Sequence, residues 1–177
     1  SGAVLDFDLF KDTPTALSAR LFRCMLDISP IPAIEYARHS DEVLLLPDLT
    51  VSSNGRVTSI LLVSKVPVQK LAARPVALAN TSATSQVLAR IILKEQYHLT
   101  PRYFECPPDL PEMLREADAA LLIGDDALRV WVRQPKELYV YDLGEAWKAL
   151  TGEAMVYAVW AVRKTYAAKH PERVGAV

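Results

Sequence analysis

The feature that most constrains this chain is the alternation of short apolar runs with segments of helical character. Apolar runs that read as buried strands lie at Ser59–Ser64, Pro75–Ala79, Ala119–Ile123 and Val156–Val162. Each is shorter than an ordinary helix. The segments between them carry helix signals, such as the apolar spacing of Gln86–Tyr97. Strands that alternate with helices are typical of α/β proteins, so the sequence predicts that class.

The order of the strands predicts two lobes. Ser59–Ser64 is expected to lead out of the first lobe, and Val156–Val162 is expected to return to it. This division assigns residues 1–63 and 156–177 to one lobe and residues 64–155 to the other. Two crossing strands form a natural hinge, and small anionic ligands bind well in a cleft between lobes.

Composition narrows the classes of function. The 177 residues carry 20 Lys and Arg against 21 Asp and Glu, a net charge of −1, which argues against a protein held to nucleic acid by bulk charge. No apolar stretch, Val156–Val162 included, approaches the roughly 20 residues of a membrane span. No secretory signal is visible at the start. We therefore expect a cytoplasmic protein that binds neither nucleic acid nor membrane.

The sequence offers no motif for metal or nucleotide chemistry. Cys24 and Cys106 stand apart from each other and from any histidine, and no glycine-rich phosphate-binding motif occurs. The histidines are scattered over three places: His39, His98 and His170. No Ser/His/Asp or Cys/His arrangement can be assembled from them. We expect no metal and no cofactor, and an enzyme of this kind would use few acid–base groups of its own.

The segment Ser82-Ala83-Thr84-Ser85 lies between a strand and a helix and is the strongest local signal. Three hydroxyl groups and the unpaired N–H groups of a helix N-terminus form a cradle for an anion, carboxylate or phosphate. The alternative is that one of these residues only caps the helix. The pattern alone leaves both interpretations open.

A second signal follows the buried strand Ala119–Ile123. Ligands of open α/β sheets lie beyond such strand ends, so Asp125 in Gly124-Asp125-Asp126 is a candidate to orient a ligand hydroxyl or to act as an acid or base. The alternative is that Asp125 caps a short helix, Asp126–Arg129. Beyond it, Trp131–Arg133 and Leu138–Tyr141 are expected to pair as edge strands.

A third candidate is Ser29, in the proline-rich segment Ser29–Pro32. We expect this segment to be a rigid loop after a strand at Met25–Ile28. The alternative to a ligand contact by the Ser29 hydroxyl is a plain rigid turn.

Several segments together resemble one family. They follow in order along nearly the whole chain: Ile34–His39 (IEYARH), Leu45–Leu49 (LLPDL), Ser82–Ser85 (SATS), Ala119–Leu128 (AALLIGDDAL), Tyr141–Leu143 (YDL) and Tyr157–Trp160 (YAVW). They resemble the chorismate dehydratases of the futalosine route to menaquinone. The resemblance implies a two-lobed fold similar to type II periplasmic binding proteins, without export. It also implies the conversion of chorismate to 3-[(1-carboxyvinyl)oxy]benzoate and water, without a metal or an organic cofactor.

The resemblance also implies which residues contact chorismate, a dianion that needs two anion-binding spots. The hydroxyl-rich loop is matched by Ser82, Ala83, Thr84 and Ser85, and the facing wall by Ser29, Ile31 and Ser59. Gly124 and Asp125 are expected near the ring hydroxyl or the leaving water. The enolpyruvyl carboxylate of the substrate is a candidate for taking the proton, which leaves the protein to position and polarise.

Two other functions remain as alternatives. One is a non-catalytic solute-binding protein for a small carboxylate. The other is the sister lyase or cyclase of the futalosine pathway, for which we expect a histidine after the strand that ends at Ile123. This chain has Gly124 there, which favours the dehydratase.

The resemblance further implies that an N-terminal strand and C-terminal helices of the family are missing from this sequence. An uncovered sheet edge favours association, so a homo-oligomer is possible.

Overall fold

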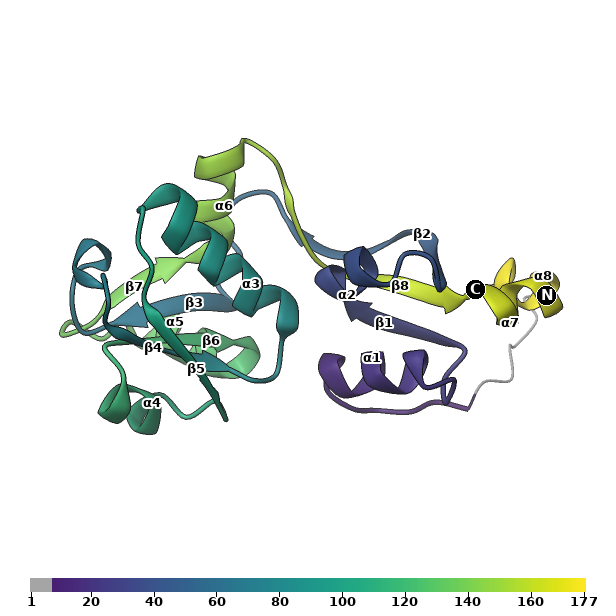
Figure 1. Ribbon diagram of the computed structural model, residues 1–177, viewed down its shortest axis with the longest axis horizontal. Coiled ribbons are helices and arrows are strands. Elements are labelled where there is room, and N and C mark those ends of the chain that lie inside the picture. Colours follow the sequence, from purple (N-terminus) through teal and green to yellow (C-terminus); the bar gives the residue numbers. More distant parts are fainter. Residues whose placement is uncertain (1–7) are drawn as a thin grey trace. The chain divides into compact units, whose positions relative to one another are not determined.

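The computed structural model describes residues 8–177, which form a mixed α/β structure (Figure 1). The chain divides into two compact units. Unit 1 comprises Ser1–Thr50 and Ala158–Val177, and unit 2 comprises Val51–Tyr157. Two strands run from one unit into the other: β2 (Val43–Ser53) and β8 (Met155–Arg163).

Unit 2 is built on a five-stranded sheet with the order β5-β4-β6-β3-β7. The neighbours β5, β4 and β6 are parallel, whereas β3 is antiparallel to both β6 and β7. The central strands β4 and β6 are apolar along their whole length because helices cover both faces. The strands are β3 (Ile60–Ser64), β4 (Pro75–Ala79), β5 (Arg102–Cys106), β6 (Ala119–Ile123) and β7 (Tyr139–Asp142).

Two apolar cores lie on the two faces of this sheet. Leu88 and Ala89 of α3 belong to one core, and Ala127 and Val130 of α5 belong to the other. The helical segments of unit 2 are η1 (Val68–Lys70), α3 (Ala83–Ile91), the π-helical η2 (Ile92–Gln96), α4 (Leu110–Glu116), α5 (Gly124–Arg133) and α6 (Leu143–Thr151).

The strand order places two helix N-termini at the carboxyl ends of neighbouring strands. Strand β4 leads into α3 on one face, and its parallel neighbour β6 leads into α5 on the other face. Adjacent parallel strands whose helices lie on opposite faces leave a crevice at their carboxyl ends, where ligands of open α/β sheets bind.

Unit 1 contains a three-stranded sheet with the order β1-β8-β2. Strand β1 (Ile28–Pro32) pairs antiparallel with β8. Helix α1 (Pro14–Phe22) begins after the cap residue Thr13, and its Leu21 packs in the small core of this unit. The remaining helices are α2 (Ala33–Arg38), α7 (Lys164–Lys169) and α8 (Pro171–Val174).

The structure differs from the predicted lobe boundaries. Ser59–Ser64 does not lead out of unit 1, because Ile60–Ser64 lies inside the sheet of unit 2 between β6 and β7. The outward crossing is β2, and the chain passes between the units at Thr50–Val51 and Tyr157–Ala158. Sequence pattern marked β3 as a buried strand but carried no information about which strands it pairs with.

Two local expectations were also wrong. Ser29–Pro32 is not a loop but most of β1, since it pairs with residues 158–161 of β8. Trp131–Arg133 is not a strand, because α5 continues through Arg133. Among residues 8–177, none of the helices has both the length and the apolar character needed to cross a bilayer.

Candidate functional site

The hydroxyl-rich segment forms the N-terminus of α3, directly after β4. Ser82 is the N-cap, and its Oγ accepts a hydrogen bond from the Ser85 N–H at 3.3 Å. The two hydroxyl groups of Ser82 and Ser85 lie 2.9 Å apart. The capping interpretation of this segment is therefore confirmed, and it is compatible with anion binding because one side chain does not satisfy all of the first N–H groups of a helix.

The residues of this segment differ in their exposure to solvent. Thr84 is 4% exposed and Ser85 is 1% exposed, whereas Ser82 and Ala83 are half-buried. The first turn of α3 contains no acidic residue, so the positive end of the helix dipole is not neutralised from within the helix. The N-terminus of α3 thus offers a favourable place for a carboxylate.

Two further candidates, Ser59 and Gly124, are joined by a hydrogen bond. The Gly124 N–H donates to the Ser59 carbonyl oxygen at 2.8 Å. Gly124 has φ +59, and a Cβ placed on it would meet no atom within 4 Å. The glycine is therefore required by the backbone conformation and not by close packing. Among residues 8–177 the Ser59 hydroxyl forms no hydrogen bond.

Asp125 lies in the first turn of α5 and is exposed. It does not cap the helix, because the N-cap is Ile123 and no side chain accepts a hydrogen bond there. The prediction of a cap at Asp125 was wrong. The neighbouring Asp126 forms an ion pair with Arg129, with 2.7 Å between Oδ1 and Nη1. The Asp125 carboxylate has no ion pair within residues 8–177.

The topology places these residues close to the carboxyl ends of two neighbouring strands. The carboxyl ends of β4 and β6 are adjacent, so Ser82–Ser85 and Gly124–Asp125 follow neighbouring strands, and the Gly124 hydrogen bond adds Ser59. These residues belong to unit 2 alone.

Ser29 and Ile31 belong to unit 1, on β1. Ile31 is fully buried among Leu21, Val43, Val159 and Ala161, so its side chain is part of a core. Ser29 is 3% exposed, and its hydroxyl donates to the Pro30 carbonyl oxygen at 2.9 Å.

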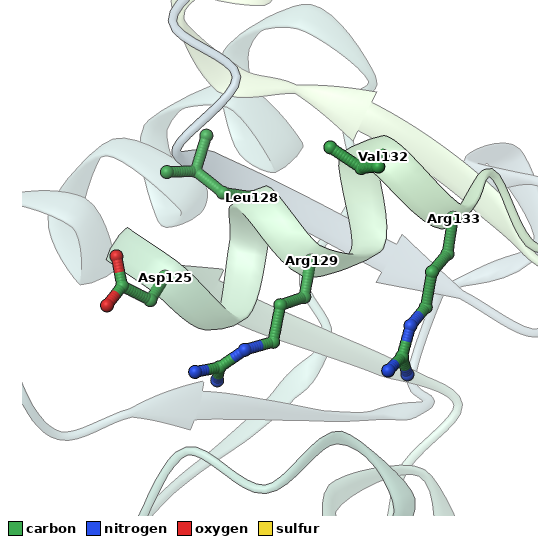
Figure 2. Close-up of a pocket in the computed structure, with 5 residues that line it drawn as sticks. All are labelled: Asp125, Leu128, Arg129, Val132 and Arg133. Atoms are coloured by element: carbon green, nitrogen blue, oxygen red, sulfur yellow. The ribbon is translucent and has the colours of Figure 1, made fainter.

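A pocket of about 370 Å³ lies along α5 (Figure 2). Its lining residues are spaced as one face of a helix: Asp125, Leu128, Arg129, Val132 and Arg133. Figure 2 shows the two arginines extending on one side of α5 and the two aliphatic side chains on the other. Only Asp125 is common to this pocket and to the site at the strand ends, so we assign the site from the strand ends and not from the pocket.

Asp142 binds the segment that directly precedes Ser59, and this was not recognised from the sequence. It is 6% exposed, and its carboxylate accepts hydrogen bonds from the N–H groups of Val57, Thr58 and Glu145. Val57 and Thr58 directly precede Ser59. An aspartate followed three residues later by glutamate signals a helix cap, but no local pattern reveals a bond across 84 residues of chain.

Tyr157 lies near enough to Asp142 for the two side chains to interact electrostatically. Its hydroxyl group is 2.9 Å from the Ser53 Oγ, which in turn donates to the Gly55 carbonyl oxygen at 2.9 Å. Burial raises the pKa of Tyr157 above its ordinary value, and the Asp142 carboxylate raises it further against the opposing effect of the Ser53 hydrogen bond. Tyr157 is therefore a neutral packing residue at physiological pH.

The metal-ligating residue types are dispersed over residues 8–177. No group of three or more His, Cys, Asp or Glu there is arranged to hold a metal ion. Cys24 and Cys106 are free thiols. Burial, followed by the charge of Glu116, raises the pKa of Cys106, which disfavours a thiolate nucleophile.

Several solved structures share the fold of this chain. Protein AF1704 from Archaeoglobus fulgidus matches with a TM-score of 0.67 at 19% identity, over 94% of this chain and 67% of that one. The substrate binding protein of an amino acid ABC transporter matches with a TM-score of 0.52 at 13% identity, over 93% and 71% of the two chains. These likenesses concern the fold alone, and they confirm the predicted α/β, binding-protein-like class.

Sequence comparison identifies the family. A chorismate dehydratase from Thermus thermophilus is 34% identical over 172 residues, which cover 89% of this chain and 62% of that enzyme. The chain thus spans less than two thirds of the length of this relative. The family described as menaquinone biosynthesis matches residues 3–176. The chain belongs to the menaquinone biosynthesis family.

Proposed function

We propose that this chain is a chorismate dehydratase, which converts chorismate to 3-[(1-carboxyvinyl)oxy]benzoate and water. The observation that carries the proposal is the 34% identity to the curated enzyme of that name. The sequence motifs support it, because they follow the order of the family. The proposed enzyme is a hydro-lyase of menaquinone biosynthesis that acts in the cytoplasm without metal or cofactor.

The reaction removes the ring hydroxyl group and a proton from the neighbouring carbon. The electron pair of the broken C–H bond completes the aromatic ring as the C–O bond breaks, and the departing hydroxide leaves as water with a proton. Aromatisation supplies much of the driving force. The protein's main task is then to hold the substrate and to stabilise charge as the bond breaks.

The charges at the two helix N-termini favour a particular orientation of chorismate. The first turn of α3 carries no acidic residue, so we place a substrate carboxylate against Ser82 and the first N–H groups of this helix. The first turn of α5 carries Asp125 and Asp126, which repel a second carboxylate. We therefore place the ring hydroxyl near Asp125, where the carboxylate accepts a hydrogen bond from it.

The residues of unit 1 enter the proposal only through the family resemblance. Ser29 and Ile31 remain predicted substrate contacts, and in this structure the Ile31 side chain is buried. A contact by Ile31 would therefore use its backbone groups. Ser59, whose hydroxyl forms no hydrogen bond within residues 8–177, is the better candidate for a side-chain contact.

The test is incubation of the purified chain with chorismate, with products separated by chromatography. The Thermus thermophilus relative serves as the positive control. We expect 3-[(1-carboxyvinyl)oxy]benzoate to appear in proportion to protein concentration. Chorismate that binds but is recovered unchanged, while the control converts it, would contradict the dehydratase and favour a solute-binding protein.

A further inference from the structure

The carboxylate of Asp142 joins two parts of unit 2 that are distant in sequence. Its Oδ1 accepts the Glu145 N–H at 3.0 Å, which caps α6. Its Oδ2 accepts the Thr58 N–H at 2.7 Å, and both oxygens lie 3.1 Å from the Val57 nitrogen. A helix cap needs only the first of these bonds. The bonds to Val57 and Thr58 therefore serve the loop that precedes β3.

That loop contains an unfavourable backbone conformation. Thr58 has φ +61, in the left-handed region that a β-branched residue rarely adopts. Its hydroxyl donates to the Val57 carbonyl oxygen at 2.7 Å. Because the loop does not favour this conformation by itself, the hydrogen bonds that its N–H groups donate to Asp142 are what hold it.

The conformation of Thr58 sets the position of the next residue. The Ser59 carbonyl oxygen receives the Gly124 N–H at 2.8 Å, at the start of α5. The Ser59 hydroxyl and the first turn of α5 are both part of the candidate site. The Asp142 carboxylate thus acts on the candidate site indirectly, through the backbone of Thr58 and Ser59. None of its own atoms belongs to the site.

We propose that Asp142 is a positioning residue of this site, holding Thr58 so that Ser59 and Gly124 keep the geometry needed to bind chorismate. The proposal rests on the proposed function for the identity of the ligand. The hydrogen-bonded arrangement itself does not depend on that identity, so the two are tested separately.

The decisive variant is Asp142→Ser. Serine is a good helix cap, but its single short hydroxyl cannot also hold the two loop amides. Asp109→Ser is the matched control, because Asp109 caps α4 through the Glu112 N–H at 3.1 Å and holds no loop. Hydrogen exchange at the amides of Thr58 and Gly124, and the dissociation constant for chorismate, are measured in both variants.

We expect faster exchange at both amides in Asp142→Ser. We also expect a chorismate affinity that is lower by about tenfold, which corresponds to the loss of one hydrogen bond to a charged group. Asp109→Ser should leave both quantities at their original values. Exchange or affinity that is unchanged in Asp142→Ser, or equally changed in Asp109→Ser, would overturn the proposal.

A rescue experiment separates positioning from general support of the fold. Thr58→Gly in the Asp142→Ser background gives the loop a residue that adopts positive φ without help. We expect the double variant to recover most of the lost affinity. A double variant as weak as Asp142→Ser would contradict positioning, and if Asp142→Ser does not fold, Asp142→Asn with and without Thr58→Gly supplies the same comparison.

The outcome for the unaltered chain distinguishes the two proposals. If that chain neither binds nor converts chorismate, the proposed function fails, whereas amide exchange in Asp142→Ser still decides whether the carboxylate holds the loop. If the unaltered chain converts chorismate and Asp142→Ser does so with the same KM and kcat, only the positioning role fails.

Discussion

At the scale of single residues, Ser82 has two roles that substitution can separate. Ser82→Ala removes the cap of α3, so we expect a loss of about 1 kcal/mol in the free energy of unfolding. It also removes a hydroxyl from the proposed carboxylate site, so chorismate affinity should fall by about 1–3 kcal/mol. Asp109→Ala removes a comparable cap on α4 and should lower stability alone. Calorimetric titration of both variants tests this, and equal affinities would contradict the site.

Gly144 is a residue whose replacement should fail for steric reasons. A Cβ at this position would lie 2.7 Å from the Tyr157 hydroxyl and 2.9 Å from the Ser53 Oγ, and would also overlap the Gly55 carbonyl oxygen. We expect Gly144→Ala to cost about 1–3 kcal/mol in urea unfolding, because overlap with backbone is hard to relieve. Gly124→Ala is the comparison, since it introduces only backbone strain of about 1 kcal/mol. A smaller loss for Gly144→Ala would contradict the packing.

At the scale of elements, the helix ends were the most predictable part of the site. Ser82 acts through hydrogen bonds to the nearby Ser85, and it marks the start of α3 in the structure. The C-terminal half of α5 was missed because Trp131 and Val132 are aromatic and β-branched residues, which are typical of strands. Its helical state depends on Ala127 and Val130 packing against the sheet, which is tertiary information.

Long-range pairing accounts for the other differences. The pairing of β3 with β6 and β7 joins segments far apart in the chain. So do the hydrogen bonds that the N–H groups of Val57 and Thr58 donate to Asp142. The sequence predicted β3 as a buried strand but not its partners, and it gave no indication of the hydrogen bonds that Asp142 accepts from Val57 and Thr58. The same reason explains why Ser59 was associated with a crossing strand that the structure places inside unit 2.

Helix α5 ends at an unfavourable residue. Gln134 follows it with φ 47, in the left-handed conformation, although its side chain donates to the Trp131 carbonyl oxygen at 2.8 Å. Glycine is the residue most often found at such a position. We expect Gln134→Gly to raise the free energy of unfolding by about 0.5–1 kcal/mol. A lower melting temperature in Gln134→Gly would mean that the side-chain hydrogen bond outweighs the strain.

At the scale of the whole molecule, tyrosines that are wholly or partly buried should limit stability in alkali. Burial raises the pKa of Tyr97, Tyr103 and Tyr157 above 10.0. Above that pH the unfolded chain loses these protons more readily than the folded one, so the free energy of unfolding falls as pH rises. Below it the three residues contribute no pH dependence.

The measurement is denaturant unfolding between neutral pH and about pH 11, repeated with Tyr157→Phe. We expect the decrease above pH 10.0 to become less steep in this variant, because one proton fewer is released on unfolding. Identical slopes in the two proteins would show that Tyr157 titrates alike in the folded and unfolded chains.

The hydrogen bond between Ser53 and Tyr157 has a consequence for how the chain is built. These residues stand near the first and last positions of unit 2, and their hydroxyl groups are 2.9 Å apart. Unit 2 is therefore one continuous stretch of chain whose two ends are joined by a hydrogen bond. This is the geometry of a domain that is inserted into another domain. Residues 51–157 should fold when expressed alone, with cooperative thermal unfolding. They should also accept circular permutation, with the original ends joined by a short linker and new termini opened in an exposed loop.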